Sequence, residues 1–148
     1  MLKYVHTNII TDDWQRLAQF YIDVFECKPL EPKRDLSGEW LEKGTAVPRA
    51  HLKGIHLALP GYDGKLPTLE IFQYEKNEER LPTLSNRKGF GHIAFLVDDV
   101  QKLVTKVLEH GGAMVGEIVE HEVPGVGLLT FAYVRDIDGN IIELQNWK

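Results

Sequence analysis

The sequence contains only one cysteine, Cys27, among its 148 residues. A single thiol excludes an intrachain disulfide and a thiolate metal cluster, and it is typical of a reducing compartment, so we expect a cytoplasmic protein. The chain also lacks any window near the roughly 20 apolar residues of a membrane span, and its first residues lack the apolar core of a signal peptide. We therefore expect neither export nor membrane insertion.

Clustered positive charge is also lacking. The chain carries 17 basic and 22 acidic residues, a net charge of −5, and this balance argues against a nucleic-acid partner. With 43% hydrophobic and 26% charged residues, the composition is that of an ordinary soluble globular protein. A length of 148 residues suits a single domain with one shared core.

The most informative feature that is present is an internal repeat. The stretch VHTNIITDDWQRL, residues 5–17, resembles GHIAFLVDDVQKL, residues 91–103. One constant offset aligns His6 with His92 and also aligns the two Asp-Asp pairs that follow them. A repeat of this length suits two half-domains, neither of which can close a core alone.

The residue pattern of each half predicts a strand followed by an amphipathic helix. Asp12 and Asp98 are expected to cap the helices, because Gln15 and Gln101 follow three residues later as capping-box partners. Strand and turn signals follow each helix, so each half reads β-α-β-β-β. We expect one domain, 1–148, with a first module at 1–75, a polar linker at 76–89 and a second module at 90–148.

Residues 35–48 have no counterpart of equal length in the second half. They suit a short helix over the sheet, in which Trp40 either covers a pocket or serves only in packing.

Side-chain alternation places four polar residues on the faces that the helices leave uncovered. Leu69 and Ile71 suit the core side of one strand, which turns Glu70 to the opposite face, and the same alternation applies to Glu143. His92 and, by the repeat, His6 face the same way. A lone carboxylate between buried apolar neighbours costs several kcal/mol, so it needs a cation or hydrogen bonds.

Two glutamates and two histidines at repeat-related positions predict a divalent metal site made of His6, Glu70, His92 and Glu143. Any one of these residues taken alone is more often exposed or satisfied by backbone groups, and the coincidence of all four reverses that expectation. Nitrogen and carboxylate donors suit Zn, Ni, Co, Mn or Fe(II), and the pattern does not choose among them. Ligands from four separate strands favour a catalytic site over a structural one.

The motifs GHIAFLVDDV, LEHGGAM and VRDIDGNIIEL resemble those of the vicinal oxygen chelate superfamily, which includes glyoxalase I, bleomycin-resistance proteins and extradiol dioxygenases. Ile137 stands where the family ending usually has proline. The resemblance implies an α+β fold in which the two β-α-β-β-β modules form an open, mixed, eight-stranded barrel-like sheet with helices outside. His6, Glu70, His92 and Glu143 match the family's ligand positions, and the full set is closest to glyoxalase I.

The function implied by this resemblance is that of a metal-dependent lyase or isomerase acting on a small substrate through a metal-chelated enediolate. Glu143 would be the base and Glu70 could share that role, and related proteins of this fold pair as homodimers. Ile10 and Tyr74 replace an arginine and an asparagine of the glyoxalase I pattern that are tied to glutathione, so a glutathione-linked substrate is not expected.

Two other functions stay open at this point. One is a metal-free small-molecule binding protein of the bleomycin-resistance type, and the other is an Fe(II) dioxygenase. His56, Tyr133 and Phe131 would line the cavity if their strands face inward, and the alternation around His56 leaves that ambiguous.

Overall fold

The computed structural model describes residues 1–148 and divides them between two units, Met1–Glu79 and Arg80–Lys148, each of which is described by itself. The first unit contains, in chain order, β1 (His6–Ile10), α1 (Trp14–Phe25), β2 (Lys28–Ser37), α2 (Glu39–Thr45), β3 (His51–Ala58) and β4 (Thr68–Tyr74). Its strands form one four-stranded sheet in the order β1-β4-β3-β2, in which β1 runs parallel to β4 and the other pairs are antiparallel.

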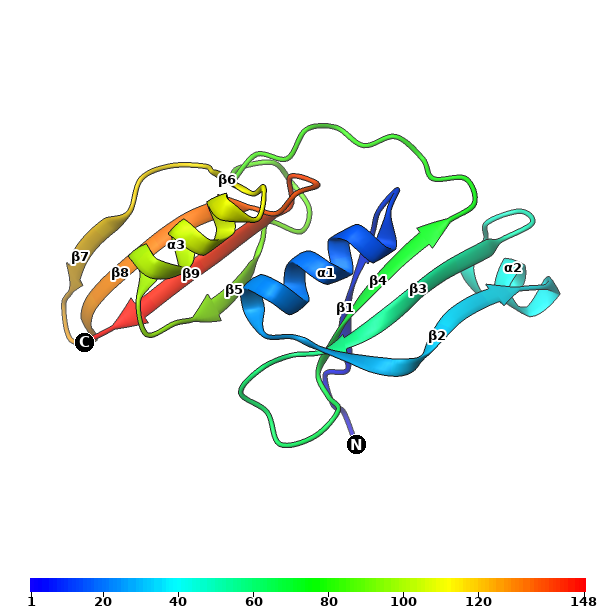
Figure 1. Cartoon of the computed structure of the whole chain (residues 1–148), viewed down its shortest axis with the longest axis horizontal. Coiled ribbons are helices and arrows are strands. Elements are labelled where there is room, and N and C mark those ends of the chain that lie inside the picture. The colour runs from blue at the N-terminus through cyan, green and yellow to red at the C-terminus, as the bar shows by residue number, and fades with distance from the viewer. The chain divides into compact units, whose positions relative to one another are not determined.

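The second unit repeats this plan. It contains β5 (Ile93–Leu96), α3 (Val100–Glu109), β6 (Ala113–Met114), β7 (Val119–Val123), β8 (Gly127–Arg135) and β9 (Ile141–Trp147). The sheet order is β5-β9-β8-β6, β7 also pairs with β8, and β5 runs parallel to β9 as β1 does to β4. In each unit a helix lies across one face of the sheet (Figure 1).

The predicted α+β class with two repeated modules and helices on one face of mixed sheets is confirmed. The predicted count of eight strands needs a correction, because the structure has nine strands, four in the sheet of the first unit and five in that of the second. The ninth strand arises because the segment after α3 pairs with β8 in two separate places, as β6 and as β7. The module limits at residues 75 and 90 stay predictions.

The helix caps lie one residue later than predicted, in both halves. Asp13 caps α1 by accepting a hydrogen bond from the backbone nitrogen of Arg16 at 3.0 Å. Asp99 caps α3 in the same way, accepting from the backbone nitrogen of Lys102 at 2.9 Å. The capping boxes expected at Asp12 and Asp98 are therefore wrong, although the internal repeat itself holds.

The core of each unit lies between the helix and the sheet. In the first unit α1 contacts β3 and β4, and in the second α3 contacts β8 and β9. Burial of this apolar surface is the main force that holds the helices in place. The largest fully buried apolar side chains include Leu17, Tyr21, Leu57, Leu69 and Ile71 in the first unit and Val107, Val134, Ile142 and Leu144 in the second. None of the helices is long and apolar enough to cross a membrane.

The extra segment of the first half does form a short helix, α2. Leu41 of α2 is buried with Ala50 and Leu52, and partly buried side chains that include Phe72 and Tyr74 pack against them. Trp40 is not part of this cluster and is 62% exposed.

Part of the predicted linker is attached to the turn between β8 and β9. Arg80 donates to the side-chain oxygen of Asn140 at 2.7 Å, and Thr83 donates to the backbone oxygen of Gly139 at 2.5 Å. Arg135 completes the network by donating to the same Gly139 oxygen at 2.9 Å and to the backbone oxygen of Thr83 at 3.0 Å. These contacts fix the turn that precedes β9.

Asp136 organises the same turn from the inside. Its carboxylate accepts from the backbone nitrogens of Asp138 and Asn140, both at 2.9 Å, and it is 3% exposed. A short acidic side chain that accepts hydrogen bonds from the backbone nitrogens two and four residues ahead is a common way to hold a tight turn.

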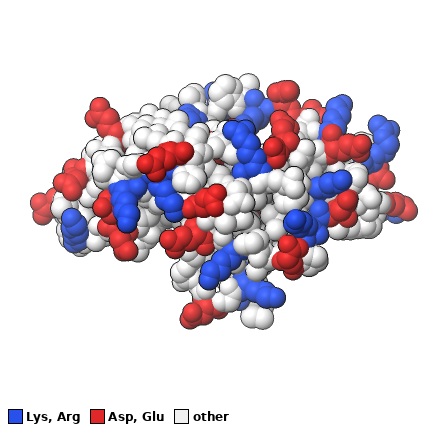
Figure 2. All heavy atoms as spheres, in the orientation of Figure 1, with Lys and Arg blue, Asp and Glu red and all other residues white.

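On the face seen in Figure 2, basic and acidic side chains are interspersed.

Cys27 is buried just after α1, and burial raises the pKa of its thiol to about 12. Because the thiolate is the reactive form, we expect the folded protein to react with iodoacetamide at pH 8 about a thousandfold more slowly than an ordinary thiol. Mass spectrometry of timed samples, with the urea-unfolded chain as the fast control, measures the ratio. Equal rates in the folded and unfolded chains would contradict the burial of this thiol.

Candidate metal centre

The first unit brings His6 and Glu70 together on the sheet face opposite α1. β1 and β4 are parallel neighbours, and His6 is aligned with Thr68, two residues before Glu70. Leu69 and Ile71 are almost fully buried on the helix side, which turns Glu70 to the other face as predicted. The Nε2 atom of His6 lies 3.3 Å from Oε2 of Glu70, and the Glu70 side chain is only 12% exposed.

His56 joins this pair, which settles the orientation that the sequence left ambiguous. It is the direct cross-strand neighbour of Glu70 on β3, and its Nε2 atom lies 3.2 Å from Oε1 of Glu70. Burial lowers the pKa of His56 below its usual value, while the negative charge of Glu70 acts in the opposite direction. The lowered pKa favours the neutral ring, which carries one N–H group.

Asn8 is a further contact of Glu70 that the sequence analysis missed. Its side-chain nitrogen donates to Oε2 and to the backbone oxygen of Glu70, both at 3.4 Å. Side-chain alternation in the stretch HTN could have predicted this contact, because residues 6 and 8 of one strand share a face. Glu70 is thus approached by His6 and Asn8 from β1 and by His56 from β3.

The second unit brings the other predicted pair together. The Nε2 atom of His92, just before β5, lies 3.0 Å from Oε2 of Glu143 on β9. Ile142 and Leu144 are fully buried on the helix side of β9, so Glu143 also faces away from the helix. Tyr133 is the cross-strand neighbour of Glu143, and its ring lies 4.9 Å from that of His92, centroid to centroid.

Tyr133 is the structural counterpart of His56, since each stands opposite the glutamate of its own sheet. Burial raises the pKa of Tyr133, and the Glu143 carboxylate raises it further. The phenol therefore stays protonated at neutral pH. Phe131, on the same face of β8, packs with its ring centroid 5.9 Å from that of Tyr133.

The two His–Glu pairs have the geometry of neighbouring ligands on a metal ion. Donors about 2.1 Å from a zinc-sized ion, at angles of about 90° to 110°, lie roughly 3.0 to 3.4 Å apart. The separations in the two pairs are 3.3 and 3.0 Å, so the donors fit such an ion in both distance and chemistry. Within either unit by itself, no group of three or more His, Cys, Asp or Glu residues is arranged to hold a metal.

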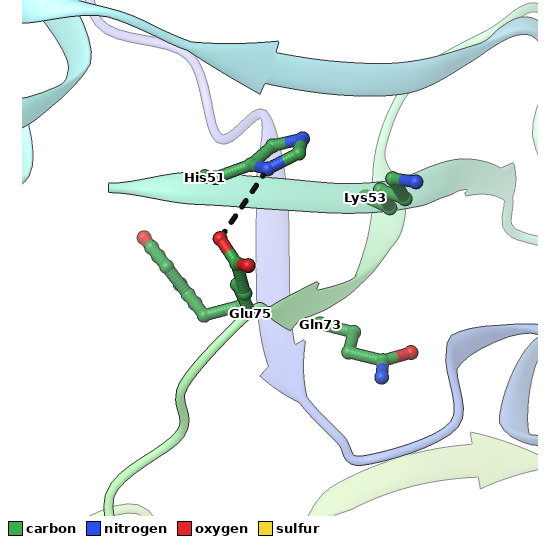
Figure 3. Close-up of a pocket in the computed structure, with 5 residues that line it drawn as sticks. His51, Lys53, Gln73 and Glu75 are labelled. Carbon is green, nitrogen blue, oxygen red and sulfur yellow. Dashed lines mark ion pairs between the residues drawn. The ribbon is translucent and has the colours of Figure 1, made fainter. Parts of the chain in front are cut away.

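A separate polar hollow of about 310 Å³ lies on the first sheet and is lined by His51, Lys53, Gln73, Tyr74 and Glu75 (Figure 3). By strand alternation, His51 and Lys53 face away from the side that carries His56. The Nδ1 atom of His51 lies 3.6 Å from Glu75, and its Nε2 atom lies 2.6 Å from Asp35. This hydrogen bond is the main cause of the lowered pKa of Asp35. The charged groups here pair with one another.

Comparison with known proteins connects the site to a family. The model of the Glyoxalase/Bleomycin resistance protein/Dioxygenase superfamily matches residues 3–144 of the chain. A probable lactoylglutathione lyase from Synechocystis sp. is 32% identical over 144 residues, which cover 95% of this chain and 92% of that protein.

Solved structures show the same fold. A glyoxalase family protein from Bacillus cereus is similar with a TM-score of 0.84 at 20% identity, over 99% of this chain and 95% of that one. The trypanothione-dependent glyoxalase I of Leishmania major is similar with a TM-score of 0.63 at 26% identity, over 99% of this chain and 87% of that one.

Proposed function

Because the chain belongs to the Glyoxalase/Bleomycin resistance protein/Dioxygenase superfamily, we propose that it is a glyoxalase-like lyase or isomerase that depends on a divalent metal ion. The observation that carries this proposal is the presence of two His–Glu pairs with ligand-like separations of 3.3 and 3.0 Å, one in each half of the repeat. The metal ligands proposed are His6, Glu70, His92 and Glu143, and the ion is Zn, Ni, Co, Mn or Fe(II).

The chemistry proposed is proton transfer on a small substrate that carries two neighbouring oxygens. A bound divalent ion supplies Lewis acidity towards such oxygens. Glu143 is the proposed base, because its Oε2 contacts His92 while no hydrogen bond or ion pair is formed by its Oε1. A carboxylate with one unengaged oxygen can take a proton from carbon and return it to the neighbouring position.

The substrate proposed is not linked to glutathione. Ile10 and Tyr74 stand where the glyoxalase I pattern has its glutathione-linked arginine and asparagine, and Tyr74 packs against the apolar cluster beneath α2. The similarity to a probable lactoylglutathione lyase points the other way. A screen should therefore compare S-lactoylglutathione with small hydroxy-carbonyl compounds that lack glutathione.

The metal content of the purified protein tests this function. We expect close to one divalent ion per chain by inductively coupled plasma mass spectrometry, and we expect its loss in the double variant His6→Ala/Glu143→Ala. The double variant His51→Ala/Glu75→Ala removes the same residue types from the polar hollow and should keep the ion. Light scattering on the same samples measures the mass, for which we propose a homodimer.

No ion after incubation with Ni, Co, Zn, Mn and Fe(II) would overturn the metal-dependent function. The His–Glu separations also suit hydrogen bonds, so that result would favour a metal-free binding protein of the bleomycin-resistance type. If Fe(II) binds, oxygen uptake in the presence of substrate separates a dioxygenase from a lyase.

A further inference from the structure

The two glutamates of the repeat differ in how their carboxylates are held. Both oxygens of Glu70 are engaged, Oε2 by His6 at 3.3 Å and by Asn8 at 3.4 Å, and Oε1 by His56 at 3.2 Å. Glu143 makes one contact, through Oε2 to His92 at 3.0 Å. The second half has no counterpart of the contact to Oε1, because Tyr133 takes the place of His56.

The contact between His56 and Glu70 has a defined direction. An ionised carboxylate oxygen can act only as an acceptor, so an N–H group on Nε2 of His56 is the partner that this 3.2 Å contact offers to Oε1. A donor of this kind fixes the rotation of the carboxylate about its terminal bond, and fixed rotation leaves Oε2 directed at His6. Outer groups that orient metal ligands typically act through polar contacts of this kind to the ligand.

Packing holds the His56 ring itself in place. Its centroid lies 5.7 Å from that of Phe72, at an interplanar angle of 71°, and 6.3 Å from that of His6. Phe72 is directly opposite Gly54 in the strand register, and the missing side chain at Gly54 leaves room for its ring. The His56 side chain is 21% exposed, so little water competes for its contact with Glu70.

We propose that His56 is a positioning residue that holds Glu70 in the orientation of a fixed metal ligand. This inference rests on the proposed function, because it gives His56 a role towards the same ion. It also assigns different tasks to the two halves of the repeat. Glu70 is immobilised on both oxygens, while Glu143 keeps the rotational freedom that a proton carrier needs.

Cobalt binding tests the proposal without any substrate. Cobalt(II) is titrated into the metal-free protein against a competing chelator, and its visible absorption spectrum reports the ligand geometry. His56→Leu keeps side-chain volume but removes the donor, and we expect cobalt to bind about 10- to 100-fold more weakly, with an altered spectrum. His56→Gln places an amide N–H near the position of Nε2, and we expect it to restore most of the affinity.

His51→Leu is the matched control, because His51 lies on the same strand and faces the opposite side. Its cobalt affinity should equal that of the unmodified chain, and circular dichroism of all variants confirms that they fold. Equal cobalt affinity in His56→Leu and the unmodified chain overturns the inference and leaves the proposed function standing. An equally large loss in His56→Gln overturns it as well, since the donor is then irrelevant. An unmodified chain that binds no cobalt overturns the proposed function together with the inference.

Discussion

Glu143→Gln is expected to lower turnover by a factor of about 10² to 10⁴ while the metal ion stays bound, which is the usual range for removing a general base. Glutamine has the same shape and keeps an oxygen atom that can bind a metal ion beside His92. In the unmodified chain, Oε2 of Glu143 lies 3.0 Å from the Nε2 atom of His92. It cannot accept a proton from carbon at neutral pH. Steady-state kinetics on the best substrate of the screen, with metal content measured on the same samples, gives the result.

Glu122→Gln is a suitable control for that measurement. It removes the same charge from the same sheet at an exposed position on β7 and should leave turnover unchanged. Full activity in Glu143→Gln would contradict the assignment of the base. If Glu70→Gln instead kept its metal and lost turnover, Glu70 would be the base, which its engagement on both oxygens argues against.

Gly54→Ala is expected to have the largest effect on stability. A Cβ atom at this position would collide with the backbone oxygen of Ile71 and would lie 2.6 Å from Cδ1 of Phe72. A backbone oxygen in a sheet cannot move aside cheaply, so we expect the free energy of unfolding to fall by about 3 kcal/mol. Such a loss corresponds to a decrease of roughly 10 °C in the melting temperature, which scanning calorimetry measures.

Gly44→Ala provides the contrast, because apart from its chain neighbours and the backbone of α2 itself no atom lies within 4 Å of the Cβ position at Gly44. The same added methyl group should there be neutral or stabilise by up to about 1 kcal/mol, since alanine favours helices over glycine. If both alanine variants melted at the same temperature, the close approach of β3 and β4 at Gly54 would be refuted.

The sequence allowed the modules and the two glutamate faces to be predicted because both depend on local patterns. Glu70 and Glu143 each lie between two apolar residues of a strand, and alternation alone decides which way such a residue points. His56 was harder, because buried side chains occur on both faces of β3, at Leu52 as well as at Ile55 and Leu57. A strand with two buried faces has no clear apolar side.

Other features depend on contacts that no local pattern records. Two consecutive aspartates begin each helix, and which one caps it is decided by a single backbone hydrogen bond. Asp12, the residue predicted as the cap, instead accepts a hydrogen bond at 2.5 Å from the side-chain nitrogen of Asn77, which is distant in the sequence. The number of strands and their division into two sheets follow from pairing between distant segments, which strand propensity does not specify.

The attachment of Arg80 and Thr83 to the turn before β9 bears on where the second half could be cut out as a separate folding unit. The second unit holds part of the connecting peptide as part of its own architecture. A fragment beginning at residue 90 would therefore lack part of this folding unit, since Arg135 would lose its bond to the backbone oxygen of Thr83 and the backbone oxygen of Gly139 would lose the bond from the Thr83 hydroxyl.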